Sequence, residues 1–290
     1  MPTYAVAGVT GHVGGVVAQT LLDQGRKVRV LVRETSKGER WRKRGAEVAV
    51  ADLGNAHDLA GCLRGAEAAY LMLPPMPPAT IGVRGRAKKM LDAMVQAVGG
   101  TDLKHVVFLS SQGAQHADGT GVVVLLHDAE QEFRTLKTPV TFLRPTYFVE
   151  NWFRALPDAK EGLLESFFPL DFRHPHVATH DVGKVVAELV LEHPKAHRVV
   201  ELAGPEEASS VEVAAMLSRL LGSEVEPVEE PIEDVTPALT HVGFSPEMAS
   251  MYQGLYQGIV SGRIAFEHPE SARHGKDGIE HTLGQMLSRI

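Results

Sequence analysis

The sequence predicts a doubly wound α/β fold, in which helices cover both faces of a parallel sheet, together with a smaller C-terminal α/β lobe. Short β-branched runs alternate with helical patterns through the first half of the chain, which is typical of parallel strands joined by right-handed crossovers. A glycine-rich turn follows the first of these strands. With 290 residues, the chain is long enough for one large domain with a smaller lobe.

The first strand and the first helix are joined by Gly8–Gly14 (GVTGHVG), directly after the apolar run Tyr4–Ala7. Gly8 permits a tight turn, Gly11 lets backbone N–H groups approach a pyrophosphate, and Gly14 lets the helix pack close to the strand. This spacing is a dinucleotide-binding fingerprint and makes the predicted domain a Rossmann fold. The cofactor phosphates are expected on the helix N-terminus. Their expected neighbours are Thr10, His12 and Val13.

The remaining elements of the first half follow from the same alternation. Strands are expected at Thr3–Ala7, Lys27–Arg33, Glu47–Val50, Ala68–Leu73, His105–Ser110 and Val140–Leu143. Amphipathic spacing predicts helices at His12–Gln24, Lys37–Arg44, His57–Leu63, Ile81–Val98 and Val123–Leu136. In such a sheet the ligand lies beyond the carboxyl ends of the strands, so the residues directly after each strand are the candidate site.

After Arg144-Pro145 the alternation gives way to an aromatic-rich insertion. A helix near Asp181–Leu191 and a strand near Arg198–Leu202 are expected to rejoin the main sheet. Helices near Ser210–Leu221, Pro246–Ser261 and Gly278–Ile290 are expected in the lobe. We therefore predict a dinucleotide-binding domain in residues 1–145, completed by 176–204, and a small substrate-binding lobe in residues 146–175 and 205–290.

The end of the second strand indicates which dinucleotide binds. An NAD-selective site places an acidic side chain there for the ribose hydroxyls, whereas this chain has Arg33, with Lys37 close behind. Arginine matches a 2′-phosphate in charge and in bidentate geometry. Glu34 keeps NAD open as the alternative, since it can face the ribose instead. We expect NADP(H), with the adenine beside Asp52 and Leu53 and the nicotinamide-side ribose along Leu73 and Pro74.

Several segments together resemble the NmrA-like group of atypical short-chain dehydrogenases/reductases. They are Gly8–Gly14, Leu31–Arg33, Ser110-Ser111 with Gly113-Ala114, Glu130, Leu143–Asn151, Asp181–Gly183 and Leu202–Gly204. The most specific of them is Leu143–Asn151. The group includes quinone oxidoreductases, a triphenylmethane-dye reductase and redox-sensing regulators that bind the dinucleotide without turning it over. The resemblance therefore implies the fold and the cofactor more firmly than it implies catalysis.

The Tyr-x-x-x-Lys pair of typical dehydrogenases is absent, because none of the five tyrosines has a lysine four residues later. Members of the group often keep a lysine four residues before the helix glutamate, but Leu126 stands four residues before Glu130. His127 is the next residue and a candidate catalytic residue, with a structural role as the alternative. Ser110 and Gln112 are further candidates that can hydrogen-bond the nicotinamide amide or an acceptor oxygen. Capping the following turn is the alternative role for serine.

Hydride transfer is possible without the Tyr-x-x-x-Lys pair. A quinone or a cationic dye delocalises the incoming electron pair, so its reduction needs mainly positioning against the cofactor. The aromatic insertion supplies candidates for a flat platform, with a role as lobe core as the alternative. The expected substrate-pocket residues are Tyr147, Phe148, Asn151 and Trp152, with Phe167 and Phe168 as further stacking surfaces.

The amino-acid composition limits the classes of partner that this chain is expected to bind. A net charge of −7 argues against binding nucleic acid by bulk electrostatics, and the basic cluster around Trp41 (Arg40, Arg42, Lys43 and Arg44) is expected to be a solvated helix face. No apolar stretch approaches the length of a membrane span. The single cysteine, Cys62, excludes an internal disulfide and fits a reducing compartment.

No metal is expected, because His174, His176, His180 and Asp181 do not have a convincing ligand spacing. We therefore predict a cytoplasmic NADP(H)-dependent reductase that acts on a small aromatic or quinone-like molecule, with a homodimer as the default assembly. The alternative is a non-catalytic NADP(H) sensor that acts on a protein partner. The missing lysine favours the sensor, and the aromatic insertion favours the reductase.

Overall fold

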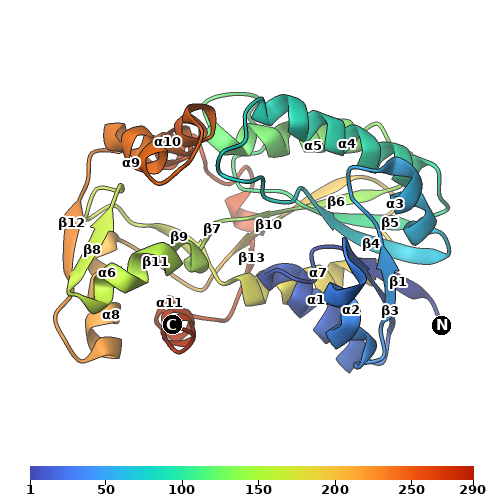
Figure 1. Cartoon of the computed structure of the whole chain (residues 1–290), viewed down its shortest axis with the longest axis horizontal. Helices are drawn as coiled ribbons and strands as arrows, with labels where there is room; N and C mark the ends of the chain where they lie inside the picture. Colours follow the sequence, from blue (N-terminus) through green and yellow to red (C-terminus); the bar gives the residue numbers. More distant parts are fainter.

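An eight-stranded sheet forms the centre of the computed structural model, which describes residues 1–290 (Figure 1). The strand order is β13-β10-β6-β5-β4-β1-β2-β3, and every pairing is parallel. The strands are β1 (Thr3–Val6), β2 (Lys27–Val32), β3 (Glu47–Val50), β4 (Ala66–Met72), β5 (His105–Leu109), β6 (Val140–Pro145), β10 (Arg198–Ala203) and β13 (Arg273–His274). The predicted doubly wound Rossmann-like fold is confirmed.

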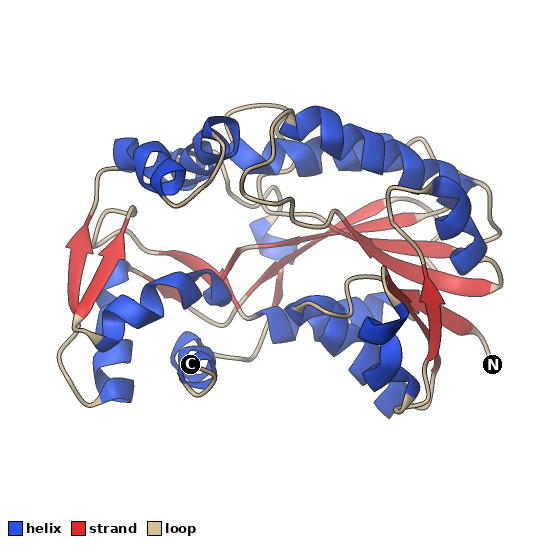
Figure 2. Cartoon of the chain, in the orientation of Figure 1, coloured by secondary structure: helices blue, strands red, loops and turns tan.

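Helices cover both faces of this sheet (Figure 2). One face carries α1 (His12–Asp23), α2 (Thr35–Arg42) and α7 (Thr179–Val190), and the other carries α3 (Ala56–Leu63), α4 (Val83–Gly99) and α5 (Val124–Phe133). Along β1 and the residue after it, Tyr4 and Val6 join the core cluster on the α1 side, while Ala5 and Ala7 join the cluster under α4. Burial on both faces explains why this strand is apolar throughout.

Close backbone contacts fix α1 between the sheet and α7. A Cβ atom on Gly14 would lie 2.5 Å from the carbonyl oxygen of Ala7, so only glycine lets α1 start this close to β1. A Cβ atom on Gly183 of α7 would lie 2.5 Å from the Cβ of Val16 in α1. Both contacts hold the N-terminus of α1 at the carboxyl end of β1.

A second group of elements lies beyond the carboxyl ends of the central strands (Figure 1). It contains a three-stranded sheet, β11-β9-β7, and a two-stranded sheet, β12-β8. Its strands are β7 (Tyr147–Phe148), β8 (Leu163–Ser166), β9 (His174–Val177), β11 (Glu207–Ala208) and β12 (Glu226–Glu229). Its helices include η2 (Val149–Ala155), α6 (Leu156–Lys160), α8 (Ser210–Leu221) and α11 (Ile279–Leu287). A separate core cluster that includes Trp152, Leu164 and Leu283 holds this group together.

The C-terminal segment does not stay within the expected lobe. Arg273–His274 of β13 pairs with β10 at the edge of the main sheet. The helices α9 (Val235–His241) and α10 (Pro246–Val260) follow the short η3 (Ile232–Asp234), and η4 (Pro269–Ser271) precedes β13. Met248 and Ala249 of α10 share a core cluster with Ala87 of α4 and Leu125 of α5.

Helix α10 is attached at two places to the half of the molecule that is built on the main sheet. The carboxylate of Glu247 accepts the N–H groups of Gly82 and Val83 at 2.6 and 2.9 Å, which caps the N-terminus of α4. Gly254 packs against Gly121 of η1 (Gly121–Val123), where an added Cβ would lie 2.9 Å from the Cα of Gly121. The helix position therefore depends on glycine at both of these residues.

Replacing Gly121 by alanine tests this contact. Gly121 has a φ of +56°, and an added Cβ would meet the backbone of Met251 and Leu255 in α10. We expect Gly121→Ala to lower the free energy of unfolding by about 3 kcal/mol or more, from left-handed strain plus overpacking. Gly222→Ala is the matched control, because Gly222 has a φ of +70° and no atom within 4 Å of its added Cβ. It should cost only about 1–2 kcal/mol in urea unfolding. Equal losses would contradict the packing argument.

Candidate functional site

Two adjoining cavities lie at the carboxyl ends of the central strands. The glycine-loop cavity, about 1230 Å³, begins at Gly8 and Gly11–Val16 and extends to α11. The proline-loop cavity, about 620 Å³, lies under Leu73–Met76, which follow β4. The two cavities share a wall formed by Met72, Pro75, Leu109, Tyr147, Phe148, Asn151, Tyr252 and Leu255. A ligand that lies along this shared wall can occupy both cavities.

The glycine loop presents unpaired backbone donors to its cavity. Gly8 has a φ of +65°, and the N–H of Gly11 donates to the carbonyl of Gly8 at 2.9 Å, which closes the turn. Gly11 is the N-cap of α1, and no side chain caps this helix. The first N–H groups of the helix therefore face the cavity without a protein partner, in the arrangement that binds phosphate. The cradle fits the pyrophosphate of a dinucleotide.

The structure brings some of the expected cofactor residues together at these cavities. The glycine-loop cavity is lined by Gly8, Gly11, His12, Val13 and Gly14, and the proline-loop cavity by Leu73, Pro74 and Ser110. The lining of neither cavity includes Thr10, Arg33, Lys37, Asp52 or Leu53. These residues follow β1, β2 and β3, which are neighbours in the sheet, so they lie along one edge of the fold. Arg33 and Lys37 are exposed there.

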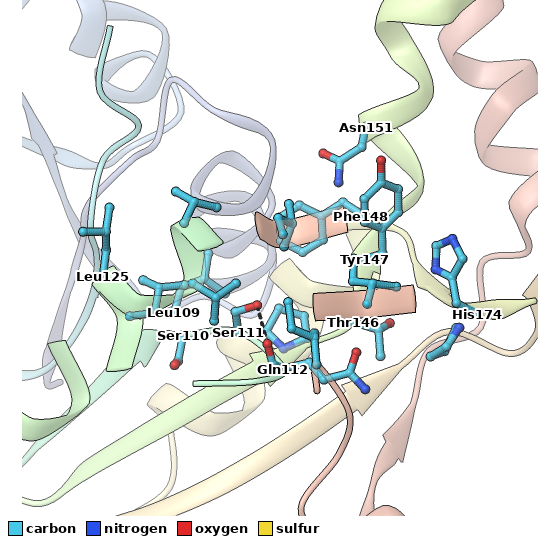
Figure 3. A pocket seen from close by; sticks show the side chains of 18 of the residues that line it. Leu109, Ser110, Ser111, Gln112, Leu125, Thr146, Tyr147, Phe148, Asn151 and His174 are labelled. Carbon is cyan, nitrogen blue, oxygen red and sulfur yellow. Dashed lines mark hydrogen bonds between the residues drawn. The ribbon is translucent and has the colours of Figure 1, made fainter. Parts of the chain in front are cut away.

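Ser110 and Gln112 both line the proline-loop cavity and are buried. The hydroxyl of Ser110 donates to Glu130 at 2.6 Å, so its proton is engaged and its oxygen is left to accept a bond. Figure 3 shows Ser110, Ser111 and Gln112 following one another along the cavity wall, with the hydroxyl of Ser111 donating to the carbonyl of Gln112 at 3.0 Å. These polar groups end β5 in a fixed turn.

A buried ion pair supports this turn from behind. The Nε and Nη2 atoms of Arg144 donate to the two oxygens of Glu130 at 2.8 and 2.7 Å, and both side chains are at least 97 % buried. Nη1 of Arg144 donates to Glu267 at 2.8 Å. Burial alone would lower the pKa of Arg144, but hydrogen bonds and charge from Glu130 and Glu267 raise it. The pair joins β6, α5 and the C-terminal segment beneath Ser110.

The structure turns His127 away from both cavities. Its Nδ1 lies 2.9 Å from the carbonyl oxygen of Ala114, and it is part of neither lining. Leu126, one residue earlier, lines the proline-loop cavity. The helix register therefore puts an apolar side chain where the resemblance implies a lysine, and it gives His127 a structural hydrogen bond.

The aromatic insertion divides between the cavity wall and the core. Tyr147, Phe148 and Asn151 form part of the shared wall, and Figure 3 shows them above the strand ends. Trp152 lines neither cavity. It is 6 % exposed within the lobe core, and its indole N–H donates to Nε2 of His176 at 3.2 Å. Phe168 is also buried, whereas Phe167 lines the glycine-loop cavity.

Two histidines from β9 stack beside this wall. The rings of His174 and His176 are 4.2 Å apart, and Tyr147 meets both rings edge-on. Because Trp152 can only donate, Nε2 of His176 is unprotonated and Nδ1 donates to the carbonyl of His174. Burial lowers the pKa of His174 to about 3 and that of His176 to about 4. His174 therefore faces the proline-loop cavity as a neutral ring.

Other residues at the cavities were not predicted. Trp41 is 1 % exposed, and the guanidinium groups of Arg40 and Arg44 lie 4.8 and 5.5 Å from the centroid of its ring. All three line the glycine-loop cavity, where the sequence indicated only a solvated face. Tyr252, Tyr256 and Arg154 also line it. Sequence spacing offered one signal for the two tyrosines, since residues four apart share a helix face.

The side chains of His180 and Asp181, in the first turn of α7, lie together with that of Asp277, with possible ligand atoms within 4.8 Å of one another. The carboxylate of Asp181 accepts the N–H groups of Lys276 and Asp277 at 2.6 and 2.7 Å. Nδ1 of His180 lies 2.6 Å from Asp277. These bonds hold the segment between β13 and α11.

No helix in the structure combines the length and apolarity required to cross a bilayer.

The parallel sheet, the glycine turn and the cavities at the strand ends define a Rossmann-like α/β protein. The chain belongs to the NmrA-like family, whose model matches residues 2–264. It is 24% identical to the NAD(P)H azoreductase of Xenophilus azovorans over 252 residues, 87% of this chain and 85% of that protein. It is also 24% identical to quinone oxidoreductase 2 of Escherichia coli (strain K12) over 251 residues, 85% of this chain and 84% of that protein.

Solved structures show the same fold. Triphenylmethane reductase of Citrobacter sp., complexed with NADP(H), superposes with a TM-score of 0.83 at 19% identity, covering 98% of this chain and 100% of that chain. The NADPH-dependent quinone oxidoreductase of Escherichia coli, complexed with NADPH, gives a TM-score of 0.82 at 22% identity, covering 98% and 99%. The resemblance drawn from the sequence motifs is confirmed at the level of family and fold.

Removing one partner of the buried Arg144–Glu130 ion pair tests how much the pair stabilises the protein. Glu130→Leu leaves the guanidinium of Arg144 buried without its bidentate partner, which should cost about 3–5 kcal/mol of unfolding free energy. The double variant Glu130→Leu with Arg144→Met should lose less than the sum of the two single losses. Glu280→Gln is the control, since it breaks the exposed pair with Arg219 and should leave the urea midpoint nearly unchanged. Additive losses would show that the pair is not coupled.

Proposed function

We propose that this chain is an NADP(H)-dependent reductase that transfers a hydride to a planar conjugated acceptor such as a quinone. The observation that carries the proposal is the shared wall, where a cavity that starts at a phosphate-binding loop opens onto a second, largely apolar cavity. Family membership and the names of the relatives support it. The single, half-buried Cys62 supports a reducing compartment, and we place the protein in the cytoplasm.

In this proposal the glycine loop and the first turn of α1 hold the pyrophosphate, and Arg33 and Lys37 hold the 2′-phosphate. Bound NADPH supplies a hydride. Leu73 and Pro74 exclude water from one side, and the acceptor oxygen of Ser110 and the amide of Gln112 are available to orient an amide or a carbonyl. Tyr147 and Phe148 provide the flat wall for the acceptor. His127 and Trp152 have no part in this chemistry, because neither side chain reaches a cavity.

A non-catalytic sensor is the second candidate function. One observation favours it: Leu126 occupies the cavity wall four residues before Glu130, where the resemblance implies a lysine. A sensor binds the two redox states of the cofactor with different affinities but does not turn it over. The two functions differ in whether NADPH is consumed.

Stopped-flow mixing separates the two functions. We expect protein-dependent, saturable oxidation when the protein and NADPH are mixed with quinones or cationic dyes and nicotinamide absorbance is followed at several protein concentrations. A protein heated to unfold it is the control for direct reaction between NADPH and acceptor. Tight binding of NADPH without oxidation by any acceptor would overturn the reductase and favour the sensor.

Reversing the charge at Arg33 tests the choice of dinucleotide. Arg33→Asp should weaken NADPH binding by about 2 kcal/mol or more, because a charge-assisted bond to the 2′-phosphate is lost. NADH lacks this phosphate, so its dissociation constant should change little in the same fluorescence titration. Equal weakening for both dinucleotides would contradict the assignment, and so would an unchanged affinity for NADPH.

A further inference from the structure

Two tyrosines of α10 face the glycine-loop cavity from the side opposite α1. Tyr252 and Tyr256 are four residues apart, so they share one face of the helix, and both line the cavity. The opposite face carries Gly254 and Gly258, which pack against Gly121 and the carbonyl of Gly119. These glycine contacts press the helix against η1 and fix the direction in which the tyrosines project. The two phenols are therefore held in place rather than placed on a mobile loop.

Burial keeps the phenols at this cavity protonated. It raises the pKa of both Tyr252 and Tyr256, so each hydroxyl retains a proton that it can donate to a ligand in the cavity. Burial also raises the pKa of Tyr147, which lies on the shared wall. Figure 3 shows Tyr147 and Asn151 together on the shared wall.

The guanidinium group of Arg154, from η2, adds a positive charge beside these phenols. It lowers the pKa of both Tyr252 and Tyr256, against the larger effect of burial. It lies 5.3 Å from the ring centroid of Phe244 and forms no ion pair with a carboxylate. Four arginines (Arg40, Arg44, Arg154 and Arg289) and one acidic residue (Glu150) line this cavity, so its lining carries an excess of positive charge. The side formed by α10 and η2 therefore offers hydrogen-bond donors together with a positive charge.

We propose that Tyr252, Tyr256 and Arg154 bind the acceptor oxygen that gains negative charge during reduction, and that they select conjugated carbonyl acceptors over cationic dyes. This inference rests on the proposed reductase function and names its substrate class. Preorganised donors aimed at a developing oxyanion accelerate such reactions, and they would replace the stabilisation that a tyrosine–lysine pair gives elsewhere. A cationic dye gains no oxyanion and is repelled by Arg154.

The reaction balances with NADPH as the two-electron reductant. The hydride adds to a carbon conjugated with the carbonyl, the C=C π pair shifts toward the carbonyl carbon, and the C=O π pair moves to the oxygen. That oxygen then takes one proton from water, so the products are the reduced acceptor, NADP⁺ and a hydroxide ion in the solvent. Tyr252 and Tyr256 donate hydrogen bonds to the oxygen and stay protonated.

Steady-state kinetics with two acceptor classes test the selection. In Tyr252→Phe, Tyr256→Phe and Arg154→Gln we expect kcat for a quinone to fall about 100-fold, with an unchanged dissociation constant for NADPH. The rate with a cationic triphenylmethane dye should hold in the tyrosine variants and rise in Arg154→Gln. Arg154→Lys should restore part of the quinone rate. Tyr4→Phe is the matched control, because Tyr4 of β1 is buried in the core on the α1 side of the sheet and lines neither cavity.

Equal losses for quinone and dye would assign these residues a merely structural role and overturn the inference, and so would an unchanged quinone rate. If the wild-type protein binds NADPH but reduces no acceptor, the reductase function itself is wrong. A measurement without turnover distinguishes the two failures. Bound 4-nitrophenol should titrate to its yellow phenolate at a lower pH than free 4-nitrophenol, and Arg154→Gln should abolish this shift. The absence of a shift in the wild-type protein would overturn the oxygen-binding role.

Discussion

The buried ion pair of Arg144 and Glu130 supports the turn after β5, where Ser110 and Gln112 line the proline-loop cavity. It joins β6 to α5, and Ser110 at the end of β5 donates to the same carboxylate. The third partner, Glu267, extends the network to the segment that leads into β13, and the carboxylate of Glu201 in β10 accepts the N–H of Glu267 at 2.7 Å. A buried charge near the carboxyl end of β6 is tolerated only because these partners enclose it.

The parts of the fold that depend on local spacing were predictable. Both faces of β1 are covered, so its apolar run identifies a central strand, and Gly8–Gly14 marks the tight turn from β1 into α1. Element ends differ by only a few residues; for example, the helix expected at Val123–Leu136 is α5 at Val124–Phe133, with the short η1 (Gly121–Val123) directly before it. Strands of two residues, such as Tyr147–Phe148 and Arg273–His274, are set by their partners and leave no periodic signal.

The candidate site was less predictable, because a single position of helix register decides which side chain reaches a cavity. Leu126 lines the wall while His127 bonds to Ala114. In the insertion, Asn151 lines the wall while Trp152 enters the core. The contributions of Arg154 and Tyr252 depend on the packing of segments about a hundred residues apart in the chain, which short-range patterns do not encode.

The capping of α4 by Glu247 has a mechanical consequence. Together with the glycine contact to η1, it makes α10 part of the main-sheet body, although the helix follows the lobe in the chain. Arg154 sits in η2, whose neighbours α6 and α11 belong to the other body. The two sides of the cavity are therefore built from segments that alternate along the chain. Arg154 in turn contacts the ring of Phe244, which shares a core cluster with α10, so this contact ties the lobe to the main-sheet body across the cavity.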